Sequence, residues 1–381
     1  MITMEIPSTG YPLLDSLISY GIFELILRVD PLANVHRPPL NTGKCLVVKS
    51  RVDDISAFRR LIEYELRKLS NSPDFQERLI DLVNVGGPRL PAHEVLIRYL
   101  KSMEAFNEGD ILAPIKGRRG KANSTLYMIF IPVFGKGIRV YDSVYDPKRT
   151  VASPITNALS LIGLAFYSVK SRSREARIER ILRYAIAFPP SVAVNGRVFL
   201  VVRRAIQLLE GNPDSRRVIE RLAYVPNRLV PLILFSQLDL LSLRTFVDVD
   251  PTIVAIGIER STRGGMESAR PFNEYSALDV CRFLVELGEA AWEFKQLITG
   301  LTLTYLYGQI SDALSVLLEI HSSIVNRDAS LFSRALYGVQ KIREMCQREE
   351  NLLRMLKRYY FISRKSIVKV VCTMEKLSKL V

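Results

Sequence analysis

The chain has 381 residues, of which 48% are hydrophobic, and it carries 53 basic and 39 acidic residues for a net charge of +14. This length suits two domains, and the apolar content is sufficient to give each a core, which excludes intrinsic disorder as a description of the whole chain. The basic excess favours a polyanionic partner such as nucleic acid, or an acidic protein surface.

The cysteines and the apolar runs exclude further classes of protein. Cys45, Cys281, Cys346 and Cys372 are far apart and form no C-x-x-C pair, so neither a zinc site nor a disulfide framework is indicated. We expect them to be buried, reduced thiols. No basic-then-apolar leader opens the chain, and no uncharged apolar run reaches the roughly 18 residues that a membrane span needs. These features predict an intracellular, cytoplasmic protein without membrane contact.

Hydrophobic periodicity predicts mixed helices and strands up to about residue 260. Residues 12–29 have apolar side chains at helical spacing and stop before Asp30-Pro31, which predicts a helix. Residues 45–48 predict a short buried strand. Further helices are predicted at 53–69, 73–83, 92–104, 155–169, 171–188 and 214–222, and strands at 198–202, 228–235 and 252–258.

The most distinctive stretch, residues 114–149, combines a basic glycine loop with a β-hairpin. Two apolar β-runs, 126–133 and 138–144, flank the turn Phe134-Gly-Lys-Gly137. The preceding loop carries Lys116, Arg118, Arg119, Lys121 and Asn123, and Lys136 and Arg139 flank the turn. Glycines let a backbone approach a phosphate closely, and loops of this composition can also enter a groove. We therefore expect this stretch to contact nucleic acid.

A second basic cluster lies within residues 171–188. Its arginines are Arg172, Arg174, Arg177, Arg180 and Arg183, against only Glu175 and Glu179. The spacing of three residues between the last four arginines predicts that they share one side of a helix.

The pattern after Arg260 becomes almost wholly helical. Arg260 and Arg263 belong to a second basic glycine loop, and Pro271 is the last proline. Helices are predicted near 276–299, 301–326, 329–360 and 363–380, which together make a bundle. Lys357, Arg358, Arg364 and Lys365 flank the aromatic residues 359–361, which either stack on bases or fill space between bundle helices.

Catalytic signatures are weak throughout the chain. Residues 41–45 hold the Gly-Lys of a phosphate-binding loop but lack its first glycine and its Ser/Thr, so a nucleotide hydrolase is not indicated. His36, His93 and His321 are widely separated. Asp248 and Asp250 would share one face of an extended segment, which Glu259 could join in a magnesium-dependent nuclease centre. Acidic residues near a strand end more often have a structural role.

The chain resembles the large subunit of archaeal type I CRISPR surveillance complexes, in the short type I-A form. The resemblance is carried by residues 11–29, YPLLDSLISYGIFELILRV, by residues 305–328, YLYGQISDALSVLLEIHSSIVNRD, and by the order of an α/β part, a basic hairpin and a helical bundle. It implies a subunit without catalysis of its own that binds a crRNA-containing complex and other effector subunits. It also implies recognition of the motif flanking target DNA and retention of the displaced strand, with cleavage left to a helicase-nuclease. The resemblance assigns no individual site residue.

The sequence thus predicts an α+β protein with a mixed α/β domain at residues 1–265, bearing the basic hairpin, and a basic four-helix-type bundle at 266–381. We expect a non-catalytic nucleic-acid-binding protein that needs no cofactor or metal. A metal-dependent nuclease centred on Asp248 and Asp250, and a scaffold that binds acidic proteins, remain alternatives. The residues predicted to contact nucleic acid are Lys116, Arg118, Arg119, Lys121, Asn123, Lys136, Arg139, Arg174, Arg177, Arg260, Arg263, Lys357, Arg358, Arg364 and Lys365.

Overall fold

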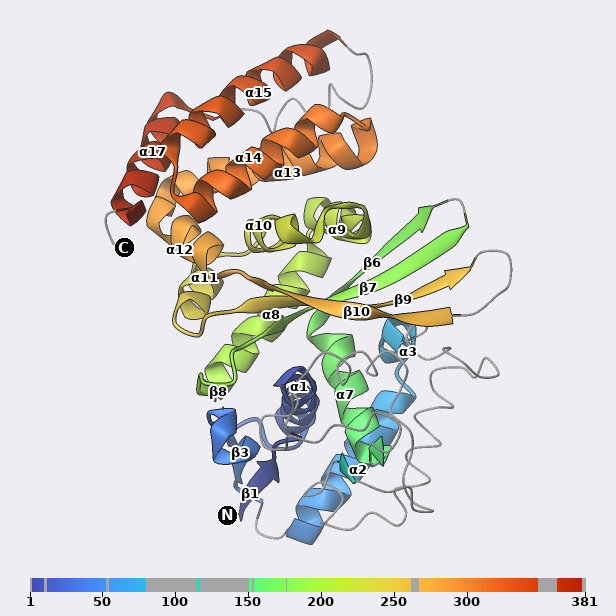
Figure 1. The fold of residues 1–381 in the computed structure, drawn as a ribbon. Helices are drawn as coiled ribbons and strands as arrows, with labels where there is room; N and C mark the ends of the chain where they lie inside the picture. The colour runs from blue at the N-terminus through green and yellow to red at the C-terminus, as the bar shows by residue number, and fades with distance from the viewer. Residues whose placement is uncertain are drawn as a thin grey trace. The chain divides into compact units, whose positions relative to one another are not determined.

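The computed structural model describes residues 2–9, 12–52, 55–79, 115–116, 151–152, 154–175, 177–261, 267–348 and 362–378. The protein has an α+β fold, with strands in its first part and a helical carboxyl-terminal region (Figure 1). One compact unit comprises Met1–Ser168, Arg174–Arg203 and Val254–Asn273, and the other comprises Val169–Ser173, Arg204–Ile253 and Glu274–Val381. The boundary predicted at residues 265 and 266, the helix at 92–104 and the hairpin at 126–144 lie outside the described residues.

The first unit contains a four-stranded antiparallel sheet in the order β1-β3-β2-β8. Val48 of the central strand β3 opposes Met4 on one side and Val35 on the other. The strand predicted at 45–48 is confirmed within β3. β1 and β2 were not predicted; β2 has only four residues, whereas β1 alternates Ile2, Met4 and Ile6 with other residues as a strand does. The bounds are β1 (Ile2–Pro7), β2 (Asn34–Arg37), β3 (Lys44–Ser50) and β8 (Val194–Asn195).

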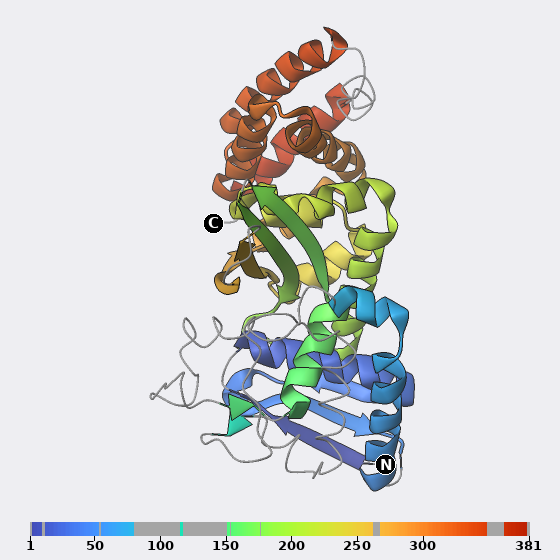
Figure 2. The same cartoon turned by 90° about the vertical axis from the view of Figure 1, so that its right-hand side faces the viewer.

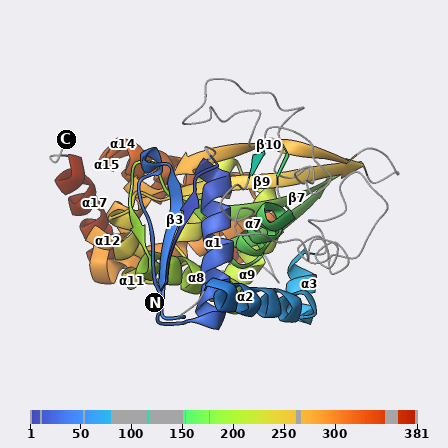
Figure 3. The same cartoon turned by 90° about the horizontal axis from the view of Figure 1, so that it is seen from below.

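Helix α1 (Pro12–Val29) confirms the first predicted helix and is buried along nearly its whole length. It lies along the sheet, between β3 and α7 (Pro154–Phe166), as Figures 2 and 3 show. The two helices cross closely, because a Cβ built on Gly21 would overlap the carbonyl oxygen of Leu159, and one on Gly163 that of Leu17. Glycine at both positions therefore sets the distance between the two helix backbones.

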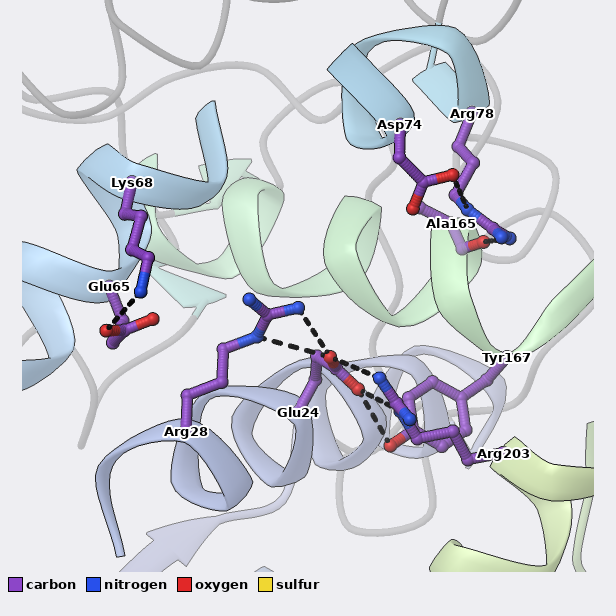
Figure 4. Close-up of polar contacts among 9 residues, drawn as sticks. All are labelled: Glu24, Arg28, Glu65, Lys68, Asp74, Arg78, Ala165, Tyr167 and Arg203. Carbon is purple, nitrogen blue, oxygen red and sulfur yellow. Dashed lines mark hydrogen bonds and ion pairs between the residues drawn. The ribbon is translucent and has the colours of Figure 1, made fainter. Parts of the chain in front are cut away.

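A buried carboxylate joins α1 to α8 (Gly196–Gly211) within the first unit (Figure 4). Glu24 is 1% exposed, and its carboxylate accepts hydrogen bonds from Arg28 Nη2 at 2.9 Å and from Arg203 Nε at 2.6 Å. The hydroxyl of Tyr167 donates to the same carboxylate at 3.5 Å, and its ring stacks on Tyr20 with centroids 4.4 Å apart. Two guanidinium groups thus compensate the burial of one negative charge.

Helices α2 (Ile55–Ser70) and α3 (Pro73–Leu79) confirm the helices predicted from residues 53 and 73. Arg78 of α3 donates from Nη1 to the carbonyl oxygen of Ala165 in α7 at 3.4 Å, and its Nε pairs with Asp74 at 3.0 Å (Figure 4). The bond to Ala165 links α3 to α7, and the ion pair within α3 holds the Arg78 side chain in place.

A second buried carboxylate, Asp15, holds the turn that connects β1 to α1. It accepts hydrogen bonds from Ser8 Oγ at 2.5 Å, Thr9 N at 2.7 Å and Thr9 Oγ1 at 2.6 Å. Arg37 is also buried, and its Nη2 donates to the carbonyl oxygens of Pro189 at 2.7 Å and Val192 at 3.0 Å. Burial raises the pKa of Asp15 to about 6, although these hydrogen bonds and the charge of Arg37 act to lower it.

The raised pKa of Asp15 predicts a specific pH dependence of stability. The folded protein favours the protonated carboxyl of Asp15, so protonation of this group adds to the free energy of unfolding. The added stability is complete below about pH 4 and is lost as pH rises through about 6, a loss of about 3 kcal/mol. The neutral amide of asparagine resembles the protonated acid, so Asp15→Asn should gain stability relative to the wild type between pH 4 and 7. Urea unfolding of both proteins across this range measures the difference, and a difference independent of pH would contradict the prediction.

The second sheet has the order β10-β9-β7-β6, and most of its residues belong to the first unit. Its strands are β6 (Ser168–Glu175), β7 (Ile178–Ala187), β9 (Thr252–Ser261) and β10 (Glu267–Ser276). The helix predicted at 171–188 is wrong, because these residues form β6 and β7. The strand predicted at 252–258 is confirmed in β9. β10 was missed, since it is mostly polar and contains Pro271, a residue that edge strands tolerate.

The second unit is predominantly helical, and its carboxyl-terminal part confirms the helical region predicted after residue 276, although several element boundaries differ from the prediction. The chain breaks at Gly288 and Gln309, both with positive φ, whereas Gly300, the predicted break, is buried inside a helix. Two predicted strands are wrong: residues 198–202 lie in α8 of the first unit, and residues 228–235 lie in the short helix η5 (Asn227–Leu229) and in α10. The helices are α9 (Pro213–Glu220), α10 (Val230–Phe235), α11 (Leu240–Val247), α12 (Leu278–Leu287), α13 (Ala291–Gly308), α14 (Ser311–Asn326), α15 (Ala329–Arg348) and α17 (Arg364–Ser378).

Helices α13, α14 and α15 lie side by side (Figure 1). Of the thiols in the described ranges, Cys45 and Cys281 are buried as predicted, whereas Cys372 of α17 is exposed.

Among the helices that the structure describes, none is long and apolar enough to cross a membrane.

Candidate nucleic-acid interface

The arginine-rich segment forms the β6–β7 hairpin instead of the predicted helix. β6 ends at Glu175 and β7 begins at Ile178, so only two residues separate the neighbouring strands, which must therefore run antiparallel (Figure 1). Burial alternates along β6: Ser171 and Ser173 are buried, whereas Arg172 and Arg174 are exposed. The period of two places the serines on one face of β6 and the arginines on the other.

The hairpin turn adds a further exposed arginine, and an ion-pair network supports it. Arg177 is exposed in the turn. Arg180 of β7 donates from Nη1 to Glu175 at 2.9 Å and from Nε to Glu259 of β9 at 2.8 Å. The hydrogen bond to Glu259 raises the pKa of Arg180 further above its usual value. Arg180 therefore links Glu175, next to the turn, to Glu259 of β9, and Arg177 is exposed in the turn itself.

Arg183 does not share the surface with the other arginines. It is 2% exposed, and its Nη2 donates to the carbonyl oxygen of Arg78. The expectation that residues 174, 177, 180 and 183 share one side is wrong, because the segment has the period of a strand. Arg174 and Arg177 are exposed, Arg180 is half-buried in the ion-pair network, and Arg183 is buried.

One face of β6 and the turn that follows it have the chemistry of a polyanion-binding surface. We call it the hairpin surface; it comprises half-buried Lys170 and exposed Arg172, Arg174 and Arg177. Over residues 168–187 the sequence has six basic and two acidic residues. Side chains at alternate positions of a strand repeat about every 7 Å, so successive cations lie in a row on one face. A two-stranded ribbon also fits the major groove of duplex DNA, where arginine binds phosphates and guanine edges.

The other predicted contact residues are distributed over several elements. Lys116 belongs to the short strand β4 (Ile115–Lys116), where it pairs with Val151 of β5 (Val151–Ala152), and Arg260 lies within β9 instead of in a loop. Arg364 and Lys365 are exposed in the first turn of α17, beside Ser363, whose backbone N donates to Glu293 at 2.6 Å. Arg118, Arg119, Lys121, Asn123, Lys136, Arg139, Arg263, Lys357 and Arg358 lie outside the described residues.

The geometry of Asp248 and Asp250 differs from that expected for a nuclease centre. Asp248 caps the end of α11 in helical conformation, and Asp250 has a φ of 49°, so they do not share the face of an extended strand. Glu259 is engaged by Arg180. In the ranges that the structure describes, no group of three or more His, Cys, Asp and Glu side chains could hold a metal ion.

Two further features of the hairpin surface were not recognised in the sequence. Lys170 and Arg172 were not included among the predicted contact residues, although the alternation Ser168-Val-Lys-Ser-Arg-Ser-Arg174 carries the signal. From residue 169 on, the basic residues alternate with Val169, Ser171 and Ser173, and this two-residue repeat indicates a strand with one basic face.

Comparison with known proteins adds no assignment. No protein-family model matches the chain, and no curated protein matches its sequence significantly.

Proposed function

We propose that this protein binds nucleic acid without catalysing a reaction on it, and that the hairpin surface supplies part of the contact. The observation that carries the proposal is the row of exposed Arg172 and Arg174 on one face of β6, continued by Arg177 at the turn. Distributed arginines bind a phosphate backbone through charge and counterion release, which requires no sequence-specific pocket. The net charge of +14 supports the same class of ligand.

In the wider form of the proposal, the protein is the large subunit of a type I CRISPR antiviral ribonucleoprotein. The α+β fold with a helical carboxyl-terminal region supports this role, as does the resemblance of residues 11–29 and 305–328. Its partners would be a crRNA-containing complex, other effector subunits and target DNA, and a separate nuclease would cleave the target. In such systems the protein reads a short flanking motif and base pairing reads the remaining sequence.

The salt dependence of DNA binding tests the hairpin surface. Each phosphate contact contributes about 0.9 to the slope of log K against log salt, so Arg172/Arg174/Arg177→Ala should lower that slope by about 2 to 3. Affinity for a 20-base-pair duplex should fall about tenfold or more at physiological salt. Fluorescence anisotropy at several salt concentrations measures both quantities.

A control variant with the same loss of charge separates local contact from overall charge. Arg60, Arg197 and Arg244 are exposed on α2, α8 and α11, and their replacement by alanine removes the same three charges. We expect this control to retain most of the salt slope. Equal slopes in both variants would refute a specific role of the hairpin, and absence of binding by the wild type would instead favour a scaffold for acidic proteins.

A further inference from the structure

A compact group of arginine and tyrosine residues lies within the second unit, where α9 is followed by the short helix η4 (Leu222–Tyr224) and packs against the last turns of α13. We call it the arginine–tyrosine patch (Arg217, Arg221, Tyr224, Tyr305 and Tyr307). Arg217, Arg221 and Tyr224 are exposed, and the other two tyrosines are half-buried.

The patch is organised around a stack of Arg221 on Tyr307. The guanidinium carbon of Arg221 lies 4.3 Å from the centroid of the Tyr307 ring. The Nη1 of Arg221 also donates to the carbonyl oxygen of Leu306 at 3.2 Å. Stacking and hydrogen bonding together hold the guanidinium over one face of the ring.

Hydrogen bonds to the backbone fix both tyrosine rings. The hydroxyl of Tyr307 donates to the carbonyl oxygen of Arg217 at 3.1 Å, and that of Tyr305 donates to the carbonyl oxygen of Tyr224 at 3.3 Å. The rings of α13 are therefore tied to α9 and η4 at their polar ends. A ligand that uses these faces would find them already ordered, which lowers the entropy lost on binding.

We infer that the arginine–tyrosine patch binds an unpaired base of single-stranded nucleic acid by stacking. A base is a flat π-system, and guanidinium groups and tyrosine rings are the side chains on which unpaired bases stack. Arg221 is exposed while it stacks on Tyr307, so a base can stack against the same pair. Exposed Arg217 at the side of the stack is placed for the adjoining phosphate.

This inference rests on the proposed function for the class of ligand, but it depends on neither the hairpin surface nor a duplex. The arginine–tyrosine patch and the hairpin surface also recognise different parts of a nucleic acid. The hairpin surface binds phosphates in a row, whereas a stacking site requires an exposed base and discriminates against a strand without bases.

The test compares oligonucleotides of equal charge that differ in their bases. Probes are fluorescein-labelled dT20, a 20-unit abasic strand and a 20-base-pair duplex, titrated by anisotropy at one salt concentration. Arg221→Lys keeps the charge but removes the planar group, and Arg244→Lys, at an exposed position of α11, is the matched control. Thermal unfolding of each variant verifies that it is folded.

We expect Arg221→Lys to weaken binding of dT20 about tenfold, with binding of the abasic strand and of the duplex changed less than twofold. Tyr307→Phe, which keeps the ring, should retain more affinity for dT20 than Tyr307→Leu. Unchanged dT20 binding in Arg221→Lys, or equal losses with dT20 and the abasic strand, would overturn the inference. If the duplex binds through the hairpin but dT20 and the abasic strand bind equally well, the stacking inference is overturned and the role of the hairpin is kept. If dT20 binds more tightly than the abasic strand but the duplex does not bind, the role of the hairpin is overturned and the stacking inference is kept.

Discussion

Gly21→Ala is expected to destabilise the protein severely, by about 3 kcal/mol or more. The added methyl group would overlap the backbone carbonyl of Leu159, and backbone cannot rotate away as a flexible side chain could. The helices α1 and α7 would have to separate, which would loosen a contact that buries most of α1. Gly163→Ala is expected to have a similar effect, since it meets the carbonyl of Leu17 in the same crossing. The midpoint of urea unfolding measures both variants.

Gly211→Ala is the matched control for these substitutions. Gly211 is the last residue of α8, and a Cβ built there meets nothing within 4 Å, so alanine should be neutral or slightly stabilising. If Gly21→Ala unfolds at the same urea concentration as Gly211→Ala, the close crossing of α1 and α7 does not occur as described.

Glu24→Ala is expected to cost about 3 kcal/mol of unfolding free energy. The substitution leaves Arg28 and Arg203, both about 70% covered, without the carboxylate that they share. Glu24→Gln keeps a hydrogen-bond acceptor and should lose less, because only the charge is removed. Denaturant unfolding at neutral pH compares the two variants with the wild type.

An exposed ion pair provides the reference for this comparison. Asp312 and Lys341 are 3.0 Å apart, with side chains 45% and 63% exposed, so Asp312→Ala should cost less than about 1 kcal/mol. A cost for Glu24→Ala no larger than that for Asp312→Ala would show that solvent replaces the carboxylate at the arginines.

Elements with a clean local pattern could be predicted from the sequence, and those with two competing patterns could not. α1 has apolar residues at helical spacing and a proline soon after its end, and both signals agree. Residues 171–188 carry arginines at spacings of three, which favours a helix, and also an alternation of serine and arginine, which favours a strand. The sheet decides between them, because β7 is bonded to β6 and to β9, a strand more than 60 residues later in the chain.

The candidate sites depend on contacts between residues far apart in sequence. Arg174 and Arg177 could be selected from local charge alone, but the engagement of Arg180 by Glu259 requires the sheet. Likewise, Arg221 and Tyr307 are separated by 86 residues, and neither stands out in a strongly basic chain with 16 tyrosines. Composition supports only a proposal for the class of ligand, and the fold shows which side chains come together.

The strand β8 makes the amino-terminal sheet dependent on a much later part of the chain. Asn195 pairs with His36 at one edge of that sheet, and Nη2 of the buried Arg37 donates to the carbonyl oxygens of Pro189 and Val192. A nascent polypeptide shorter than 189 residues lacks both the fourth strand of this sheet and these two acceptors for Arg37. The amino-terminal sheet can therefore be completed only after about 195 residues have been synthesised, although its first strand begins at Ile2.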